Sequence, residues 1–387
     1  MKFSKQGLLA LNPPQRAAAE QIHGPVLILA GAGTGKTRTV TTRIAAMVHD
    51  EIPPSQILAV TFTNKAANEM RERVGSMIDA EHAEKLTIST FHSLCVRILR
   101  TCIERLGYKR TFSIYTQSDQ LGLLRRIIVR TAGKEENLDA KLANSLISQA
   151  KNTGKPPSDR EDALINDVYR TYQKELKQLN AVDFDDLLIL AVRGLDENPD
   201  LQREWQRRHR FVMVDEFQDT NHLQMRLLRL IVGPEQNICV VGDDDQSIYG
   251  WRGADITNIL EFERHFSDPT VIKLEENYRS TNAILRLANS LIRHNLNRRE
   301  KTLWSGKGEG EKTRLISMPD AETEADFVIG EILEKHRLRQ RPYDDMAILF
   351  RMNTQSRVME EKLRENQIPY KLIGGQSFYE RREVKDV

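Results

Sequence analysis

A glycine-rich segment that directly follows an apolar run constrains this sequence more than any other feature. The apolar run is Val26–Ala30, and residues 31–37 (GAGTGKT) follow it, with a helix expected from about Lys36. Small residues let the backbone N–H groups of such a turn surround phosphate oxygens, and the helix N-terminus adds a favourable dipole. A strand, this turn and a helix in succession predict a P-loop at the edge of a parallel sheet.

The P-loop predicts a nucleotide site built largely from main-chain donors. Its residues are Ala30, Gly31, Ala32, Gly33, Thr34, Gly35, Lys36 and Thr37. We expect Lys36 to reach the β- and γ-phosphates and the Thr37 hydroxyl to bind Mg²⁺. Ala30 replaces the first glycine of the strict pattern, where only a small residue is needed. The alternative is a glycine-rich turn with a chance Lys-Thr pair.

A second apolar run, residues 211–214, ends in the carboxylate pair Asp215 and Glu216. We expect Asp215 to hold Mg²⁺, directly or through water, and Glu216 to orient and deprotonate an attacking water. The alternative is that the pair caps a helix from about Asn221. A strand followed by Asp-Glu is weak evidence alone, but beside a P-loop it predicts a two-part nucleotidase site.

A third segment after an apolar run, residues 241–253 (VGDDDQSIYGWRG), combines an amide with two aromatic rings. Gln246 is placed to sense the γ-phosphate from a strand end. Tyr249 and Trp251 lie close to Arg252 in sequence, and exposed rings beside basic residues suit single-stranded bases, where stacking contributes ~1–3 kcal/mol per base. The alternative is that both rings belong to the core.

The order of apolar and amphipathic segments predicts an α/β fold. Strand-like runs at 26–30, 57–62 and 86–90 are each followed by a helical pattern, as in parallel βα units. Helical periodicity dominates from 108 to 209, with breaks at Gly133, Gly154 and Pro156-Pro157. The remaining strands are expected at 211–214, 237–241, 271–274, 314–317, 346–350 and 370–373, the last three separated by helices near 322–338 and 354–366.

Composition excludes some classes and leaves others open. Of 387 residues, 57 are basic and 55 acidic, so bulk charge neither favours nor excludes nucleic acid. The longest apolar runs are far shorter than the ~20 residues that a membrane helix needs. Cys95, Cys102 and Cys239 lack metal-ligand spacing, which favours reduced thiols. A cytoplasmic protein is expected.

Seven segments occur in an order that identifies a family. They are 11–15 (LNPPQ), 30–37 (AGAGTGKT), 61–67 (TFTNKAA), 89–92 (STFH), 215–219 (DEFQD), 242–249 (GDDDQSIY) and 276–280 (ENYRS). Together they resemble the motifs of the UvrD/Rep/PcrA-type superfamily-one DNA helicases. Residues 182–186 (VDFDD) and 374–379 (GGQSFY) also fit, so the resemblance covers essentially the whole chain.

The resemblance implies a domain plan. Residues 1–107 and 210–279 are expected to form a first RecA-like, P-loop NTPase domain, with 108–209 as its helical insertion. Residues 280–387 are expected to form a partial second RecA-like domain. Relatives continue beyond this point with a second insertion and motifs that contribute DNA contacts and a second arginine finger. We therefore expect those motifs to be absent, the chain to be a fragment or a shortened relative, and turnover and unwinding to be impaired.

The resemblance also assigns further site residues. Gln15 would bind the adenine edge, Arg38 and Tyr278 would pack against the base, and Arg279 would reach the γ-phosphate as an arginine finger. The motif positions that contact single-stranded DNA are Phe62, Thr63, Asn64, His92, Tyr249 and Trp251. Alternatives are that Phe62 is a core residue, that His92 caps a helix, and that Arg279 is a surface cation.

The activity implied is a DNA-dependent ATPase and 3′-to-5′ DNA helicase that uses ATP and Mg²⁺. It would act on single-stranded DNA and duplex–single-strand junctions in repair or replication. One alternative is a nucleotide-gated module that binds single-stranded DNA without productive turnover. Another is a helicase subunit of a RecB-like nuclease complex. A P-loop kinase fits poorly, because Asp215, Glu216, Gln246 and paired aromatics suit water activation and base stacking.

Overall fold

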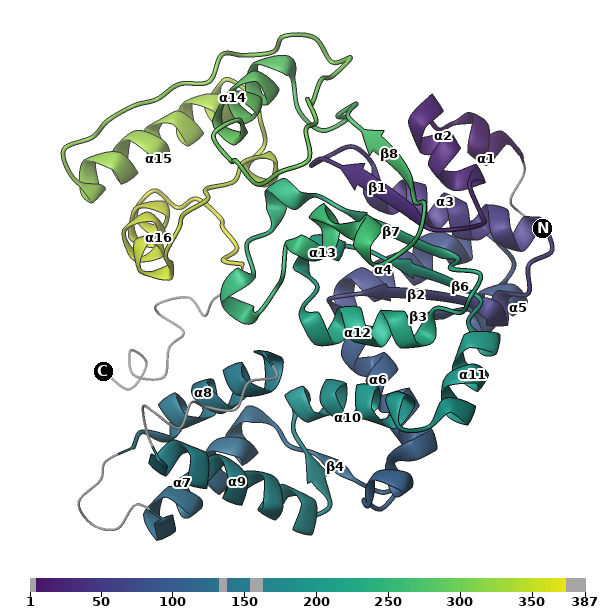
Figure 1. The fold of residues 1–387 in the computed structure, drawn as a ribbon. Helices are drawn as coiled ribbons and strands as arrows, with labels where there is room; N and C mark the ends of the chain where they lie inside the picture. Colours follow the sequence, from purple (N-terminus) through teal and green to yellow (C-terminus); the bar gives the residue numbers. More distant parts are fainter. Residues whose placement is uncertain (1–4, 132–137, 154–162, 374–387) are drawn as a thin grey trace. The chain divides into compact units, whose positions relative to one another are not determined.

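The computed structural model describes residues 5–131, 138–153 and 163–373. The chain divides into two compact units, Met1–Lys312 and Thr313–Val387, and each is described by itself (Figure 1). None of the described helices has the length and apolar character needed to cross a bilayer.

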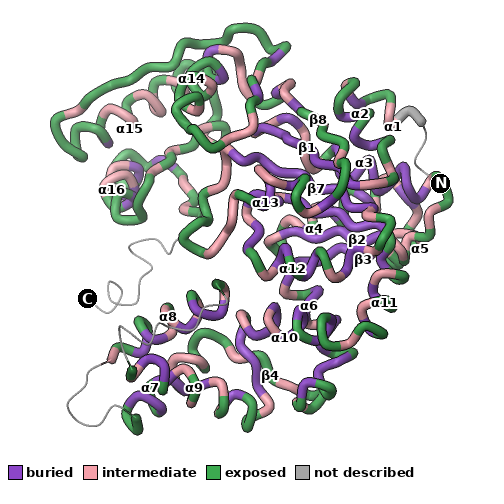
Figure 2. Tube along the Cα trace, in the orientation of Figure 1, coloured by how far each residue is buried: buried purple, intermediate pink, exposed green. Residues whose placement is uncertain are grey.

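The first unit is built on a six-stranded parallel sheet in the order β3-β2-β6-β7-β1-β8. The strands are β1 (Val26–Ala30), β2 (Ile57–Thr61), β3 (Thr87–Thr90), β6 (Phe211–Val214), β7 (Ile238–Gly242) and β8 (Thr270–Leu274). The six strands predicted for this part of the chain are confirmed to within one residue at each end. All strands but β8 are buried along their whole length (Figure 2), as expected for a parallel sheet covered on both faces.

Outside the insertion, the first unit contains α-helices on both faces of the sheet and after its last strand. They are α1 (Lys5–Leu9), α2 (Pro13–Glu20), α3 (Lys36–His49), α4 (Asn64–Met77), α5 (Ala80–Lys85), α6 (Phe91–Cys102), α12 (His222–Ile231), α13 (Thr257–Leu260) and α14 (Asn282–Ile292). Alternate residues of β1 enter different apolar clusters. Leu27 and Leu29 pack with α6 and α12, whereas Val26 and Ile28 pack with α3 and α4. Side chains of a strand alternate between faces, so each face has its own core.

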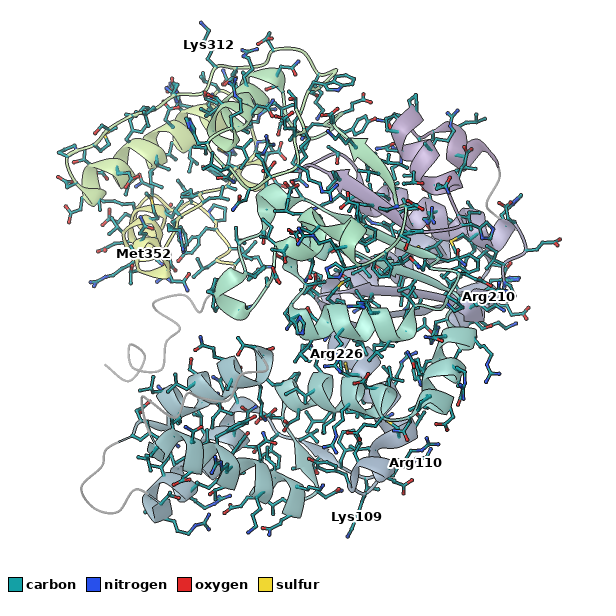
Figure 3. All side chains as sticks on the ribbon, viewed as in Figure 1. Lys109, Arg110, Arg210, Arg226, Lys312 and Met352 are labelled. Atoms are coloured by element: carbon teal, nitrogen blue, oxygen red, sulfur yellow. The ribbon has the colours of Figure 1, made fainter. Side chains whose placement is uncertain are left out.

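The insertion is helical, as predicted. It contains α7 (Gln117–Thr131), α8 (Ala140–Thr153), α9 (Ala163–Gln178), α10 (Phe184–Asp196), α11 (Pro199–Arg208) and a two-stranded ladder of β4 (Ser113–Ile114) and β5 (Ala181–Val182). Its own core surrounds Leu124 and Tyr172. Helix α10 packs on α6 and α12. Arg226 of α12, labelled in Figure 3, pairs with Asp196 of α10. The predicted breaks at Gly133, Gly154 and Pro156-Pro157 lie outside the described residues.

The second unit consists of α15 (Ala321–Arg337) and α16 (Ser356–Glu365), packed around Ile329, Leu363 and Ile368. Both helices were predicted. The prediction of strands at 314–317, 346–350 and 370–373 is wrong for this structure, because no β-ladder forms there. Leu315 and Leu349 are exposed. An extended segment is stable as a strand only when a neighbour pairs with its backbone, and these segments have no such neighbour among the described residues. The segment 374–379 is not described.

Candidate active site

The P-loop connects β1 to α3 in a conformation that its glycines permit. Gly33 and Gly35 have φ of 71° and 85°, the left-handed region that side chains disfavour. A Cβ at Gly33 would lie 2.7 Å from Nδ2 of Asn277, and one at Gly31 would overlap Leu303. Backbone conformation and close neighbours therefore both favour glycine at positions 33 and 35, whereas at Gly31 the reason is the neighbouring Leu303 side chain.

Three hydrogen bonds hold the P-loop through its carbonyl groups. Gln15 Nε2 donates to the oxygen of Thr34 at 2.8 Å, and Asn277 Nδ2 donates to that of Ala32 at 2.5 Å. The N–H of Tyr278 donates to the oxygen of Gly33 at 2.9 Å. These contacts use acceptors only, so they leave the loop's N–H groups available for phosphate oxygens.

The structure joins the P-loop lysine to the second predicted motif. Lys36 Nζ lies 2.8 Å from Glu216 Oε2, and Gln218 Nε2 donates to the same oxygen at 3.0 Å. Burial would raise the pKa of Glu216, but the charge of Lys36 and these two hydrogen bonds outweigh it and hold that pKa below its ordinary value. Glu216 also has φ of 52°, an uncommon value for a residue other than glycine. The alternative of a simple helix cap does not describe this pair: α12 is capped by Asn221.

Asp215 lies beside this ion pair in a more buried environment. Its Oδ1 accepts from the N–H of Glu216 at 2.9 Å. Burial and the neighbouring Glu216 charge raise the pKa of Asp215 to about 6. A carboxylate and the Thr37 hydroxyl are hard oxygen ligands of the kind Mg²⁺ prefers, and a cation would relieve the unfavourable burial of the Asp215 charge. These residues therefore fit the predicted metal role.

Gln246 follows β7 and is engaged with a neighbouring carboxylate. Its Nε2 donates to Asp243 Oδ2 at 2.5 Å. The Asp243 N–H in turn donates to Gln218 Oε1 at 3.0 Å. Gln218 thus connects the end of β6 to the end of β7, a role that the sequence analysis missed. Its position two residues after Glu216 was the available signal.

The predicted adenine-contacting residues lie around the start of α2 and α3. Gln15 is 1% exposed and its Oε1 accepts from the N–H of Asn12 at 3.2 Å. Asn12 Nδ2 and the Tyr278 hydroxyl both donate to Glu276 Oε2, at 2.8 and 2.7 Å. Arg38 donates to the carbonyl of Ala10. Asn12 and Glu276 therefore connect Gln15 to Tyr278, although their roles were not anticipated.

Arg279 lies beside the P-loop with an exposed side chain. Its Cβ would be 2.8 Å from a Cβ built at Gly33. Its backbone is fixed, since its N–H donates to Asn277 Oδ1 at 2.8 Å and its carbonyl accepts from Lys307 Nζ at 3.1 Å. No acceptor within the described ranges pairs with its guanidinium. The position is compatible with the predicted finger.

Five of the six predicted DNA-contacting residues line one cavity of about 880 Å³ between the sheet and the insertion; they are Phe62, Thr63, His92, Tyr249 and Trp251. Asn64, the first residue of α4, is not among the lining residues. Trp251 is 75% exposed and Tyr249 38%, so the alternative that both rings are core is wrong. The Arg252 guanidinium lies over both rings, 4.5 Å from Trp251 and 5.2 Å from Tyr249.

Phe62 keeps part of its alternative role as a core residue, whereas His92 does not cap a helix. The Phe62 ring packs edge-on against buried Phe91, with 5.5 Å between the ring centroids. The His92 ring packs edge-on against Phe184, with 5.6 Å between the centroids. Both are half-buried, so one side of each ring is used for packing and another faces the cavity. Thr90, not His92, caps α6. Burial lowers the pKa of His92, which favours a neutral imidazole.

The residues that line the opposite side of the cavity were not predicted from the sequence. It is formed by the polar side chains Lys141, Asn144, Ser145, Ser148, Gln149 and Asn152 of α8. Their spacing of three and four residues places them on one helix face, while Ala143 and Ile147 enter the core of the insertion. This amphipathic pattern was visible in the sequence, but only the helix itself was predicted from it.

Comparison with known proteins agrees with this geometry. Residues 11–267 match the UvrD/REP helicase N-terminal domain, and residues 272–387 match the UvrD-like helicase C-terminal domain. The parallel sheet with its P-loop is therefore the RecA-like helicase fold that was predicted. The expectation that the C-terminal motifs are absent holds only in part, because the second match begins at residue 272.

Similarity to curated relatives also indicates a helicase family. The ATP-dependent DNA helicase PcrA of Bacillus subtilis (strain 168) is 45% identical over 100% of this chain and 53% of the relative. PcrA of Staphylococcus aureus (strain Mu50) is 43% identical over 97% of this chain and 52% of the relative. The chain thus spans about half the length of the curated relatives it matches. The chain belongs to the UvrD/REP helicase family.

Proposed function

We propose that this chain is the ATP-hydrolysing part of a DNA helicase that moves 3′ to 5′ along single-stranded DNA in repair or replication. The observation that carries the proposal is the 2.8 Å contact between Lys36 and Glu216, which joins a P-loop to a candidate base. The cavity that contains Tyr249 and Trp251 supports DNA as the partner. The three cysteines described are free and buried, in keeping with a cytoplasmic protein.

ATP would bind with its phosphates against the N–H groups of the P-loop and the N-terminus of α3. Lys36 then turns from Glu216 to the phosphate oxygens, since the ammonium gains a stronger anionic partner. Mg²⁺, held by Thr37 and Asp215, would supply positive charge against the developing negative charge on the phosphates.

Hydrolysis would then depend on residues freed or oriented by this exchange. Glu216, released by Lys36 and still bonded to Gln218, would accept a proton from the attacking water. Gln246 and Arg279 would contact the γ-phosphate from two sides, with the Arg279 guanidinium stabilising the transition-state charge.

Single-stranded DNA would bind in the cavity beside α8. Tyr249 and Trp251 offer rings to successive bases, and Arg252 adds a cation next to both. Stacking is tolerant of base identity, so the proposed motor would act without sequence preference. Duplex–single-strand junctions would be the substrate on which unwinding starts.

A second candidate is a module that binds single-stranded DNA under nucleotide control with little turnover. It is favoured by the engagement of two catalytic candidates: Glu216 is paired with Lys36, and Gln246 donates to Asp243. If these contacts persist with ATP bound, hydrolysis by this chain is impaired while both ligands still bind.

The test is ATP hydrolysis by this chain with and without single-stranded DNA, alongside Lys36→Ala. Lys85→Ala is the matched control, because Lys85 pairs with Glu81 on the surface of α5. Hydrolysis that rises with DNA and is lost only in Lys36→Ala supports the helicase motor. Binding of both ligands without stimulated hydrolysis supports the second candidate. Binding of neither ligand contradicts both.

A further inference from the structure

Residues 298–304, here called the brace, follow α14 and contact the two loops on which the proposed function depends. The C-terminal end of the brace is hydrogen-bonded to the segment after β8. The N–H of Asn277 donates to the oxygen of Trp304 at 2.7 Å, and the N–H of Trp304 donates to that of Glu275 at 3.1 Å. Leu303 packs on Gly31 so closely that a methyl group there would overlap it. The brace therefore contacts the P-loop directly.

The N-terminal part of the brace forms ion pairs with the loop after β7. Lys301 Nζ lies 2.9 Å from Asp243, 2.6 Å from Asp244 and 2.7 Å from Asp245, measured to one carboxylate oxygen of each. Arg298 adds two hydrogen bonds to Asp245, at 2.9 and 2.8 Å. The Lys301 side chain is 2% exposed, so these contacts are made away from water.

Three consecutive carboxylates could instead suggest a metal site, and their oxygens lie within 4.8 Å of one another. The Lys301 ammonium already contacts all three, and Arg298 supplies a second positive charge. Burial would lower the pKa of Lys301, but the three carboxylates outweigh it and raise that pKa. The cluster is therefore a charged protein contact held by lysine.

The same carboxylates shape the loop that carries functional candidates. Asp243 accepts from Gln246, and three residues further on Tyr249 begins the turn that presents Trp251 to the cavity. Removing the Lys301 charge would leave adjacent buried carboxylates to repel one another, so the loop would have to rearrange. Lys301 thus holds the carboxylate that accepts from Gln246.

We propose that Lys301 is a positioning residue, and the brace a mechanical connection, that couples nucleotide binding at the P-loop to DNA binding at Tyr249 and Trp251. The proposal rests on the proposed function, since it assumes that both ligands bind at these sites. A P-loop that moves against Leu303 shifts the brace, and Lys301 passes this shift to the loop after β7. The coupling is reciprocal, so DNA also changes nucleotide affinity by the same factor.

The test measures the affinity of this chain for fluorescent single-stranded oligonucleotide with and without a non-hydrolysable ATP analogue. The ratio of the two affinities is the coupling factor, which in coupled systems is typically about 5- to 150-fold. In Lys301→Met and in Leu303→Ala we expect the factor to fall to about one. Lys301→Arg keeps the charge and should restore much of it. Lys273→Met, on the exposed surface of β8, should leave it unchanged.

Two further measurements keep the result decisive. Lys301→Met leaves buried carboxylates without their cation and could prevent folding, so the thermal unfolding of this variant is recorded. If it does not fold, Leu303→Ala decides the question, because that variant leaves the charge cluster intact. Retained affinity for each ligand alone, with coupling lost, supports the proposal. Coupling that is unchanged in folded variants, or absent in the wild-type chain although both ligands bind, overturns it. Failure of the wild-type chain to bind either ligand overturns the proposed function first.

Discussion

The proposed nucleotide-binding and DNA-binding regions of the first unit, here called the nucleotide end and the DNA end, share one sheet but differ in how their side chains are held. At the nucleotide end, Gln15, Asp215 and Glu216 are each fixed by hydrogen bonds or an ion pair to other protein groups. At the DNA end, Tyr249 and Trp251 expose their rings, with Arg252 as their cationic neighbour. One end is preorganised, and the other offers accessible surfaces.

The difference follows from the chemistry that each end would perform. Stabilising charge that develops during phosphoryl transfer requires donors and charges fixed before the reaction, because reorganisation would add to the barrier. Base stacking requires only an exposed aromatic face, and every base has a suitable partner face. Substitutions at the nucleotide end should therefore change rates, whereas those at the DNA end should change affinity.

The largest effect is expected from Glu216→Gln. This change removes the proposed base and the charge that pairs with Lys36, and loss of a general base typically costs about 10²- to 10⁴-fold in rate. We expect kcat for ATP hydrolysis to fall in this range while ATP still binds, measured by steady-state hydrolysis and analogue binding. Glu81→Gln, on the surface of α5, is the control. A loss of affinity equal to the loss of rate would contradict a preorganised catalytic role.

The next effect is expected from Trp251→Ala and Tyr249→Ala. Each removes one stacking face, so affinity for single-stranded DNA should fall by ~1–3 kcal/mol per ring, with ATP affinity in the absence of DNA unchanged. Phenylalanine at either position keeps an aromatic face and should retain most of the binding. Fluorescence anisotropy with a labelled oligonucleotide measures this. Equal losses for alanine and phenylalanine would show that the rings do not act by stacking.

At both ends the sequence predicted individual residues better than the contacts between distant segments. Lys36, Asp215 and Glu216 follow buried strands whose carboxyl ends meet at one edge, so periodicity and spacing were enough to bring them together. The contact of Gln218 with Asp243, and those of Lys301 with the carboxylates after β7, join segments far apart in sequence, which local patterns do not encode. The wrong prediction of strands in the second unit has the same cause, because a strand requires a partner that its own sequence does not specify.

Lowering the pH should change the folding stability of the first unit through His209, which lies in neither of the two ends. His209 is buried between α11 and β6, and burial, with the charges of Arg208 and Arg97, lowers its pKa to about 4. The unfolded state then binds more protons than the folded state between about pH 6.5 and pH 4, so stability falls as pH falls through this window. This contributes roughly 1.5 kcal/mol between pH 6.5 and pH 5.

The measurement is denaturant unfolding of the wild-type chain and His209→Phe at both pH values. The Nδ1 atom of His209 has no hydrogen-bond partner within the described residues, so the ring nitrogen is not needed for packing beside Trp205. The variant should lose this part of the pH dependence, and the same substitution at exposed His294 should not. Parallel curves for wild type and His209→Phe would show that His209 does not titrate as described.

The smallest effect concerns Gln15 and would sharpen the comparison most, because it asks whether the nucleotide end distinguishes bases while the DNA end does not. The Gln15 amide already bonds to Thr34 and Asn12, but it retains a second N–H and a second lone pair. That combination matches the acceptor and donor on the adenine edge. We expect Gln15→Ala to reduce the preference for ATP over GTP by about 1 kcal/mol, roughly fivefold.

The binding constants of both nucleotides decide the question, since loss of the bond to Thr34 weakens the P-loop equally for ATP and GTP and cancels in their ratio. Gln21→Ala is the matched control, because Gln21 follows α2 and bonds only to the exposed carbonyl of His23 among its described side-chain contacts. An unchanged ratio would assign Gln15 to support of the P-loop alone. The nucleotide end would then resemble the DNA end in ignoring base identity, and the contrast between them would lie only in preorganisation.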